Sequence, residues 1–196
     1  MIRQGQDADK NSLMQLWKLC FPKESERFIK FYFDKVYEND ETLVYIENCR
    51  PVASLQMIPY KIKAGNNLFL GGYIFGAMTH PDFRNKGHMA QLLNASFEEM
   101  IKKGYDYTFL IPQEKKLIGM YEKYGFKLCK PTNFPHENIV LKNPKQLANI
   151  QQAFYDVNGY WLEKETPISI EHKGMIKKLN PNATEITALY MGMMLD

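Results

Sequence analysis

The feature that most constrains this chain is an apolar segment that leads through a short turn into an amphipathic helix. Residues 68–78 are rich in aromatic and branched side chains and too few to span a membrane, so they predict a buried strand. His80 and Pro81 predict its end. Beyond the turn, apolar side chains recur at spacings of three and four and predict a helix that Gly104 caps. They are Met89, Leu92, Leu93, Phe97, Met100 and Ile101.

The start of this helix predicts an anion site. Several N–H groups at a helix start have no partner within the helix and carry the positive end of its dipole, so a phosphate group suits that position. Arg84 and Lys86, just before the helix, add side-chain charge. We therefore expect backbone amides and two cations to hold a phosphate here.

The turn reads Arg84-Asn85-Lys86-Gly87-His88-Met89. It resembles the acyl-CoA pyrophosphate loop of the GCN5-related N-acetyltransferase (GNAT) superfamily, R/Q-x-x-G-x-G/A, with Met89 in place of the final small residue. A second segment, Met120-Tyr121-Glu122-Lys123-Tyr124-Gly125-Phe126, is similar to the YEKxGF ending of that family and follows the loop where it should. The two segments together span the central half of the chain.

The resemblance implies acetyl-CoA as co-substrate and direct transfer of its acetyl group to an amine. Backbone groups at the end of the strand would hold the pantetheine, and a nearby N–H would polarise the acetyl carbonyl. The loop amides, with Arg84 and Lys86, would hold the pyrophosphate. The implied cofactor-binding residues are Ala77, Met78, Thr79, Arg84, Asn85, Lys86, Gly87, His88 and Met89.

The resemblance also implies a general acid, Tyr121, which would protonate the departing thiolate. Tyr124, three residues on, lies on the same helix face and is its rival, and simple core packing is the alternative for both. No general base stands out, and His80 before a proline also suits a plain turn. The candidate bases are His80, Asp82, His136, Glu137 and the terminal carboxylate of Asp196.

Around the loop, the order of elements predicts an α+β fold with a mixed sheet flanked by helices, as the resemblance also implies. The strand at 68–78 should run parallel to the next strand after a right-handed crossover. Helices are expected from the Asn11-Ser12 cap to Cys20, at 25–37 and at 113–124, and further strands at 42–47, 52–63, 105–111 and 137–141.

Two features have alternative interpretations. The aromatic side chains of the 25–37 helix either pack in the core or line an acceptor groove. Gly71, Gly72 and Gly76 either allow a bulge or close approach in their strand, or only weaken it.

The chain divides into an acyl-CoA-binding catalytic domain at 1–142 and a C-terminal α/β extension at 143–196, which we expect to pack on the core or on a partner subunit of a homodimer. In it we expect a helix at 147–157 and extended segments at 168–170, 175–179 and 186–194. The run 173–179 bears a weak resemblance to the C-terminal part of the enhanced-intracellular-survival (Eis) branch of the superfamily. Packing should involve Ile186, Leu189, Met191 and Met194.

Charge and cysteine content limit the classes of partner that this chain is expected to bind. A formal charge of +3 is too small to favour nucleic acid, and the three cysteines form no C-x-x-C pair and no even disulfide framework. Neither a signal peptide nor a spanning segment is indicated, so we expect a cytoplasmic protein with no metal and no membrane partner. Two functions remain open. One is an N-acetyltransferase, or a transferase of another acyl group, acting on a small-molecule or peptide amine, and the other is a non-catalytic CoA-binding sensor or interaction module.

Overall fold

The computed structural model describes residues 1–129, 140–142 and 174–186 of the 196-residue chain. By its internal contacts the chain divides into two compact units. The described part of the first comprises Met1–Ile58 and Ile74–Glu98, and that of the second comprises Pro59–Tyr73, 99–129, 140–142 and 174–186. The helix expected at 147–157, the strand expected at 168–170, and residues 187–194 lie outside the described residues.

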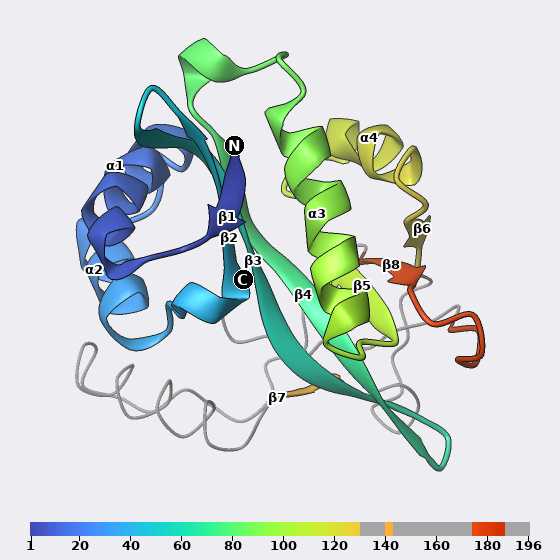
Figure 1. Ribbon diagram of the computed structural model, residues 1–196. Helices are drawn as coiled ribbons and strands as arrows, with labels where there is room; N and C mark the ends of the chain where they lie inside the picture. The colour runs from blue at the N-terminus through green and yellow to red at the C-terminus, as the bar shows by residue number, and fades with distance from the viewer. Residues whose placement is uncertain (130–139, 143–173, 187–196) are drawn as a thin grey trace. The chain divides into compact units, whose positions relative to one another are not determined.

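The strands pair into a mixed sheet in the order β1-β2-β3-β4-β5-β8-β6, with β7 paired to β3 (Figure 1). The long strands β3 (Arg50–Ala64) and β4 (Asn67–Thr79) run through both units. This arrangement confirms the predicted α+β fold with a mixed sheet.

In the first unit, β1 (Ile2–Gln4) pairs antiparallel with β2 (Thr42–Glu47), and β2 pairs antiparallel with β3. Two helices, α1 (Lys10–Cys20) and α2 (Glu26–Lys35), lie side by side in Figure 1. Ser25, where the sequence analysis expected this helix to begin, caps α2 by accepting a hydrogen bond from the N–H of Phe28 at 3.1 Å.

The predicted start of α1 was wrong by two residues. The helix begins at Lys10, so Asn11 and Ser12 lie inside its first turn and do not cap it. Asp9 precedes the helix because its carboxylate is held by Arg3 from β1, at 2.6 Å, and by the N–H of Gln6, at 2.9 Å. The Arg3 hydrogen bond also holds the pKa of Asp9 below its usual range. The ion pair joins residues only six positions apart, but it forms no helix-capping pattern that the sequence analysis recognised.

Most aromatic side chains of the 25–37 segment are core residues. Phe31, Tyr32, Phe33 and Tyr37 are buried, and only Phe28 is half-buried. Trp17 of α1 is 2% exposed and packs against three rings of this segment, those of Phe28, Tyr32 and Phe33, and also against Phe21 and Phe75. Core packing is therefore the correct interpretation for all but Phe28.

The glycines of β4 allow close approach. A Cβ added at Gly71 would collide with Ile62, and one added at Gly72 would collide with Met100. At Gly76 the backbone is left-handed, with φ of +55°, and an added Cβ would lie 2.9 Å from the Trp17 ring. The alternative, that these glycines only weaken the strand, is wrong.

Gly76→Ala should therefore lower the free energy of unfolding by about 3 kcal/mol, because backbone strain and overpacking against Trp17 act together. Gly65→Ala is the matched control. Its φ of +58° is nearly the same, yet nothing lies within 4 Å of an added Cβ, so we expect a loss of about 1 kcal/mol. Urea unfolding of both variants measures the difference. Equal losses would show that contact with Trp17 is unimportant.

In the second unit, β5 (Tyr107–Leu110) is parallel to β4 from the pair Gly71↔Tyr107 to the pair Tyr73↔Phe109, as predicted. The C-terminal strand β8 (Met175–Lys178) lies between β5 and β6 (Lys127–Leu128) and is antiparallel to both (Figure 1). The short strand β7 (Val140–Lys142) pairs antiparallel with β3. A strand from beyond residue 142 is thus part of the sheet.

Two helices differ in detail from the sequence prediction. The helix α3 (His88–Lys102) ends before Gly104, whose φ is +77°, but Ile101 is 55% exposed and does not belong to its buried stripe. The helix α4 (Ile118–Glu122) is shorter than the predicted 113–124, because its first turn is a 3₁₀ helix at Lys115–Leu117. Within the described residues, no helix is long and apolar enough to cross a membrane.

Candidate functional site

The turn between β4 and α3 has the backbone shape of an anion-binding loop. A 3₁₀ turn at Pro81–Phe83 follows β4, and Arg84 is extended. Asn85 and Gly87 are both left-handed, with φ of +61° and +78°, and α3 begins at the next residue. Nothing lies within 4 Å of a Cβ added at Gly87, so the space beside this exposed residue is open. The first N–H groups of a helix have no partner within it, so α3 begins with donors that suit an anion.

Both predicted cations lie on this loop. Arg84 is exposed, and its Nε donates a hydrogen bond of 3.2 Å to the carbonyl oxygen of Thr79. Lys86 is exposed, and its Nζ lies 4.5 Å from the centre of the Phe83 ring. The structure therefore brings Arg84 to the end of β4 and holds Lys86 over a buried aromatic ring.

The residues at the end of β4 are buried or half-buried. Met78 is 2% exposed, whereas Ala77 and Thr79 are half-buried. The last pair between β4 and β5 is Tyr73↔Phe109, so residues 74–79 lie beyond it. The Thr79 carbonyl is already engaged, because it accepts from Arg84 and from the thiol of Cys20 at 3.3 Å.

Cys20 was not among the predicted site residues. Burial raises the pKa of its thiol, while the neighbouring Arg84 guanidinium acts in the opposite direction. A cysteine at the end of a helix gives no sequence signal for such a contact, since Thr79 is 59 residues away.

His88 lies at the loop, but its side chain points into the protein. The ring is 6% exposed, and its centroid lies 4.1 Å from that of Tyr45 in β2. The Nε2 atom is 3.1 Å from Oε2 of Glu47, at the end of the same strand. Neither Tyr45 nor Glu47 was predicted, because the register of β2 and not the loop motif places them. Met89 is half-buried.

The candidate bases receive little support. The Nδ1 atom of His80 accepts a hydrogen bond of 3.3 Å from the N–H of Asp82 and caps the 3₁₀ turn, so His80 is a turn residue. The Asp82 side chain is 82% exposed. His136, Glu137 and Asp196 lie outside the described residues.

Tyr121 belongs to the second unit, in α4. It is 7% exposed, and its ring packs edge-to-face on Phe126 with centroids 5.8 Å apart. Burial raises the pKa of its phenol to about 12, so the hydroxyl keeps its proton at neutral pH. Tyr124 is half-buried, and its carbonyl accepts a 2.8 Å hydrogen bond from Lys177. Tyr121 is therefore a phenol that is able to donate its proton at neutral pH.

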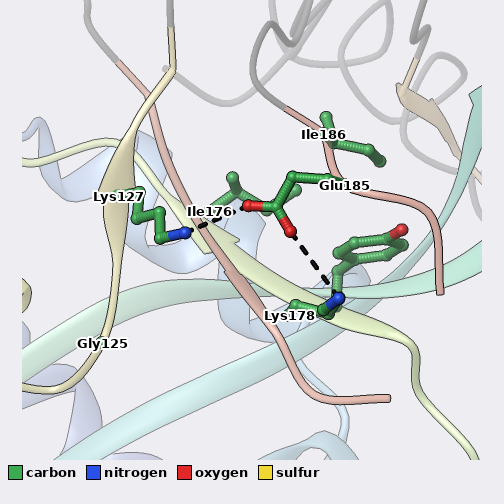
Figure 2. Close-up of a pocket in the computed structure, with 7 residues that line it drawn as sticks. Gly125, Lys127, Ile176, Lys178, Glu185 and Ile186 are labelled. Carbon is green, nitrogen blue, oxygen red and sulfur yellow. Dashed lines mark hydrogen bonds and ion pairs between the residues drawn. The ribbon is translucent and has the colours of Figure 1, made fainter. Parts of the chain in front are cut away.

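A cavity of about 230 Å³ also lies in the second unit (Figure 2). Figure 2 shows Glu185 between Lys127 and Lys178, at 3.1 and 3.6 Å. These two lysines lower the pKa of Glu185. The cavity contains none of the predicted site residues. Among the residues that the structure describes, no group of three or more His, Cys, Asp or Glu side chains could hold a metal ion.

Comparison with known families gives a match to an acetyltransferase domain. A family model described as an acetyltransferase (GNAT) domain matches residues 1–129. A comparison with curated proteins gave no match.

Similar folds occur among solved structures. A GNAT family N-acetyltransferase from Escherichia coli (YhbS), in complex with CoA, is 14% identical over 97% of this chain and 88% of its own, with a TM-score of 0.63. Eis1 from Mycobacterium abscessus is 12% identical over 66% of this chain and 32% of its own, with a TM-score of 0.59. A GCN5-related N-acetyltransferase from Anabaena variabilis is 16% identical over 66% and 32%, with a TM-score of 0.58. The chain spans about a third of the length of the first structures it matches, and these likenesses establish the fold alone.

Proposed function

Since this chain belongs to the GNAT acetyltransferase family, we propose that it transfers an acetyl group directly from acetyl-CoA to a small-molecule or peptide amine. The family supports acyl transfer in general. The observation that carries the proposal is the loop itself. Left-handed Asn85 and Gly87 open onto the start of a 15-residue helix, with Arg84 and Lys86 beside it. This arrangement suits a pyrophosphate better than any neutral ligand.

In this proposal each part of the chain has a role. The first amides of α3, with Arg84 and Lys86, bind the pyrophosphate, and backbone groups of Ala77, Met78 and Thr79 hold the pantetheine. The amine nitrogen attacks the thioester carbonyl carbon, so a C–N bond forms and the C–S bond breaks. Tyr121 gives its phenolic proton to the leaving sulfur, and the amine proton passes to a base that we leave unassigned.

Acetyl-CoA should raise the melting temperature of the wild-type protein. At a hundred-fold excess over Kd, binding to the native state adds about 2.7 kcal/mol, which for a chain of this size is roughly 5 to 10 °C. The double variant Arg84→Ala/Lys86→Ala should lose most of this shift, because two charges that face the phosphates are gone. Thermal melts with and without acetyl-CoA measure both effects.

The matched control is Lys115→Ala/Lys116→Ala, which removes the same charge from the 3₁₀ turn before α4 and should keep the full shift. If saturating acetyl-CoA gives the wild type no shift, the assignment of the loop is wrong. Release of free thiol from acetyl-CoA with a panel of amines then separates an acetyltransferase from a non-catalytic CoA-binding module. The same panel with propionyl-CoA and succinyl-CoA tests the acyl group.

A further inference from the structure

The first residue of α3 is tied to the end of β2 by a buried contact. His88 packs its ring on Tyr45, and its Nε2 lies 3.1 Å from Oε2 of Glu47, whose side chain is 35% exposed. On the other side, Phe83 of the loop lies 6.4 Å from the His88 ring between centroids. The side chain that begins the phosphate-binding helix is therefore held between the loop and a neighbouring strand.

This contact depends on a proton. Both ring nitrogens of His88 are buried, and neither has an aligned hydrogen-bond partner within the described part of the chain. A neutral imidazole can carry its single N–H on Nε2 and offer it to Glu47, but it brings no charge to the contact. A protonated imidazole carries N–H groups on both and meets the carboxylate as a charged pair. Protonation therefore strengthens the link between α3 and β2.

The surrounding charges oppose one another. Glu47 favours the protonated ring. The positive end of α3 opposes that charge. Arg50 and Lys86 are cations at the neighbouring Phe83 ring, 5.7 and 4.5 Å from its centre. The other charged or titratable groups of the loop are Arg84, Asp82 and His80. A pyrophosphate bound at the helix start would add its negative charge to that of Glu47, and both charges favour the protonated ring.

We propose that His88 is a positioning residue for the cofactor loop, which it fixes through a proton-dependent ion pair with Glu47, and that CoA binding takes up a proton at His88. The inference rests on the proposed function, because it needs CoA at this loop. Histidine is the side chain whose ordinary titration falls between pH 5 and 8, so pH 6 and pH 8 are the two conditions to compare.

The test is the Kd of CoA by calorimetry at pH 6 and pH 8 in the wild type, His88→Gln and His80→Gln. The phosphate monoester of CoA also titrates in this range, but it does so equally in every sample. The difference between the wild type and His88→Gln is therefore the contribution of His88 to the pH dependence of the Kd. We expect CoA to bind the wild type more tightly at pH 6 than at pH 8. The ratio of the Kd at pH 8 to the Kd at pH 6 should be about fivefold larger in the wild type than in His88→Gln. His80→Gln should keep the wild-type ratio. An unchanged ratio in His88→Gln, or its loss in His80→Gln, overturns the inference.

A second measurement tests the inference without the His88→Gln variant, in case that variant does not fold. In the wild type, the imidazole proton resonance of His88 is followed against pH by NMR with and without CoA, and again in Glu47→Gln. CoA should move the titration midpoint of His88 upward, and Glu47→Gln should move it downward. A midpoint that CoA does not move overturns the role of His88. Absence of CoA binding at either pH overturns the proposed function itself, so the two failures are distinguishable.

Discussion

A chain that ends after Lys173 should lose cooperative unfolding and aggregate. This truncation removes β8, which pairs with β5 on one side and β6 on the other. It also removes Met175 and Ile176, which are 0% and 5% exposed and each contribute about 1.5–3 kcal/mol of apolar burial. A native domain has only about 5–15 kcal/mol of stability, and the truncation further leaves two open strand edges.

The control is a chain that ends after Ile186, which keeps β8, the Asn180 turn and the pairs of Lys127 and Lys178 with Glu185. Expression of both chains, followed by size-exclusion chromatography and thermal melts, makes the comparison. We expect a cooperative melt only for the longer chain. A monodisperse, cooperatively melting chain of 173 residues would show that β8 is dispensable for folding.

The local features of this fold could be predicted from the sequence. The strand β4, the turn at Pro81, the helix α3 and its end at Gly104 are all encoded by neighbouring residues, through apolar spacing and turn chemistry. The same is true of Ser25 at the start of α2. The loop motif found in the sequence contains left-handed Asn85 and Gly87 and leads into the start of α3.

Features that depend on distant residues could not be predicted. The strand β1 has three residues, too few for an alternating pattern, and it forms because β2 is beside it. The sequence indicated an extended segment at 175–179, but nothing local places β8 between β5 and β6. The contact of His88 with Glu47 is of the same kind, because 41 positions separate the two residues and the register of β2 brings them together.

Replacement of Tyr121 by phenylalanine should lower kcat about 100-fold and leave the affinity for acetyl-CoA nearly unchanged. The hydroxyl acts only as the thiolate leaves, while the ring still packs on Phe126. General acids contribute about 10² to 10⁴-fold. Because a simple thiol with a pKa near 8.5 is already a tolerable leaving group, we expect the low end, about 2.7 kcal/mol of activation free energy.

Two tyrosines of the same unit serve as controls. Tyr124→Phe should have a mild effect, since that side chain is half-buried and its backbone carbonyl makes the contact with Lys177. Tyr107→Phe removes another phenol, whose pKa is raised by burial to about 12. The hydroxyl of Tyr107 donates to the carbonyl of Thr184, so this variant should lower the free energy of unfolding and leave kcat nearly unchanged. Steady-state kinetics on the best acceptor and calorimetry of acetyl-CoA binding measure the two effects separately.

The pH–rate profile gives an independent test of Tyr121. Burial raises the pKa of this phenol to about 12, and a phenol below its pKa is neutral and able to donate, so Tyr121 keeps its proton throughout pH 6 to 9. The Phe variant should therefore lower kcat by the same factor at every pH in that range and leave the shape of the profile unchanged. If the variant instead removed a limb of the profile between pH 6 and 9, Tyr121 would be titrating there and could not be a fully protonated acid. Wild-type turnover in the variant would show that another group protonates the thiolate, or that it leaves unprotonated.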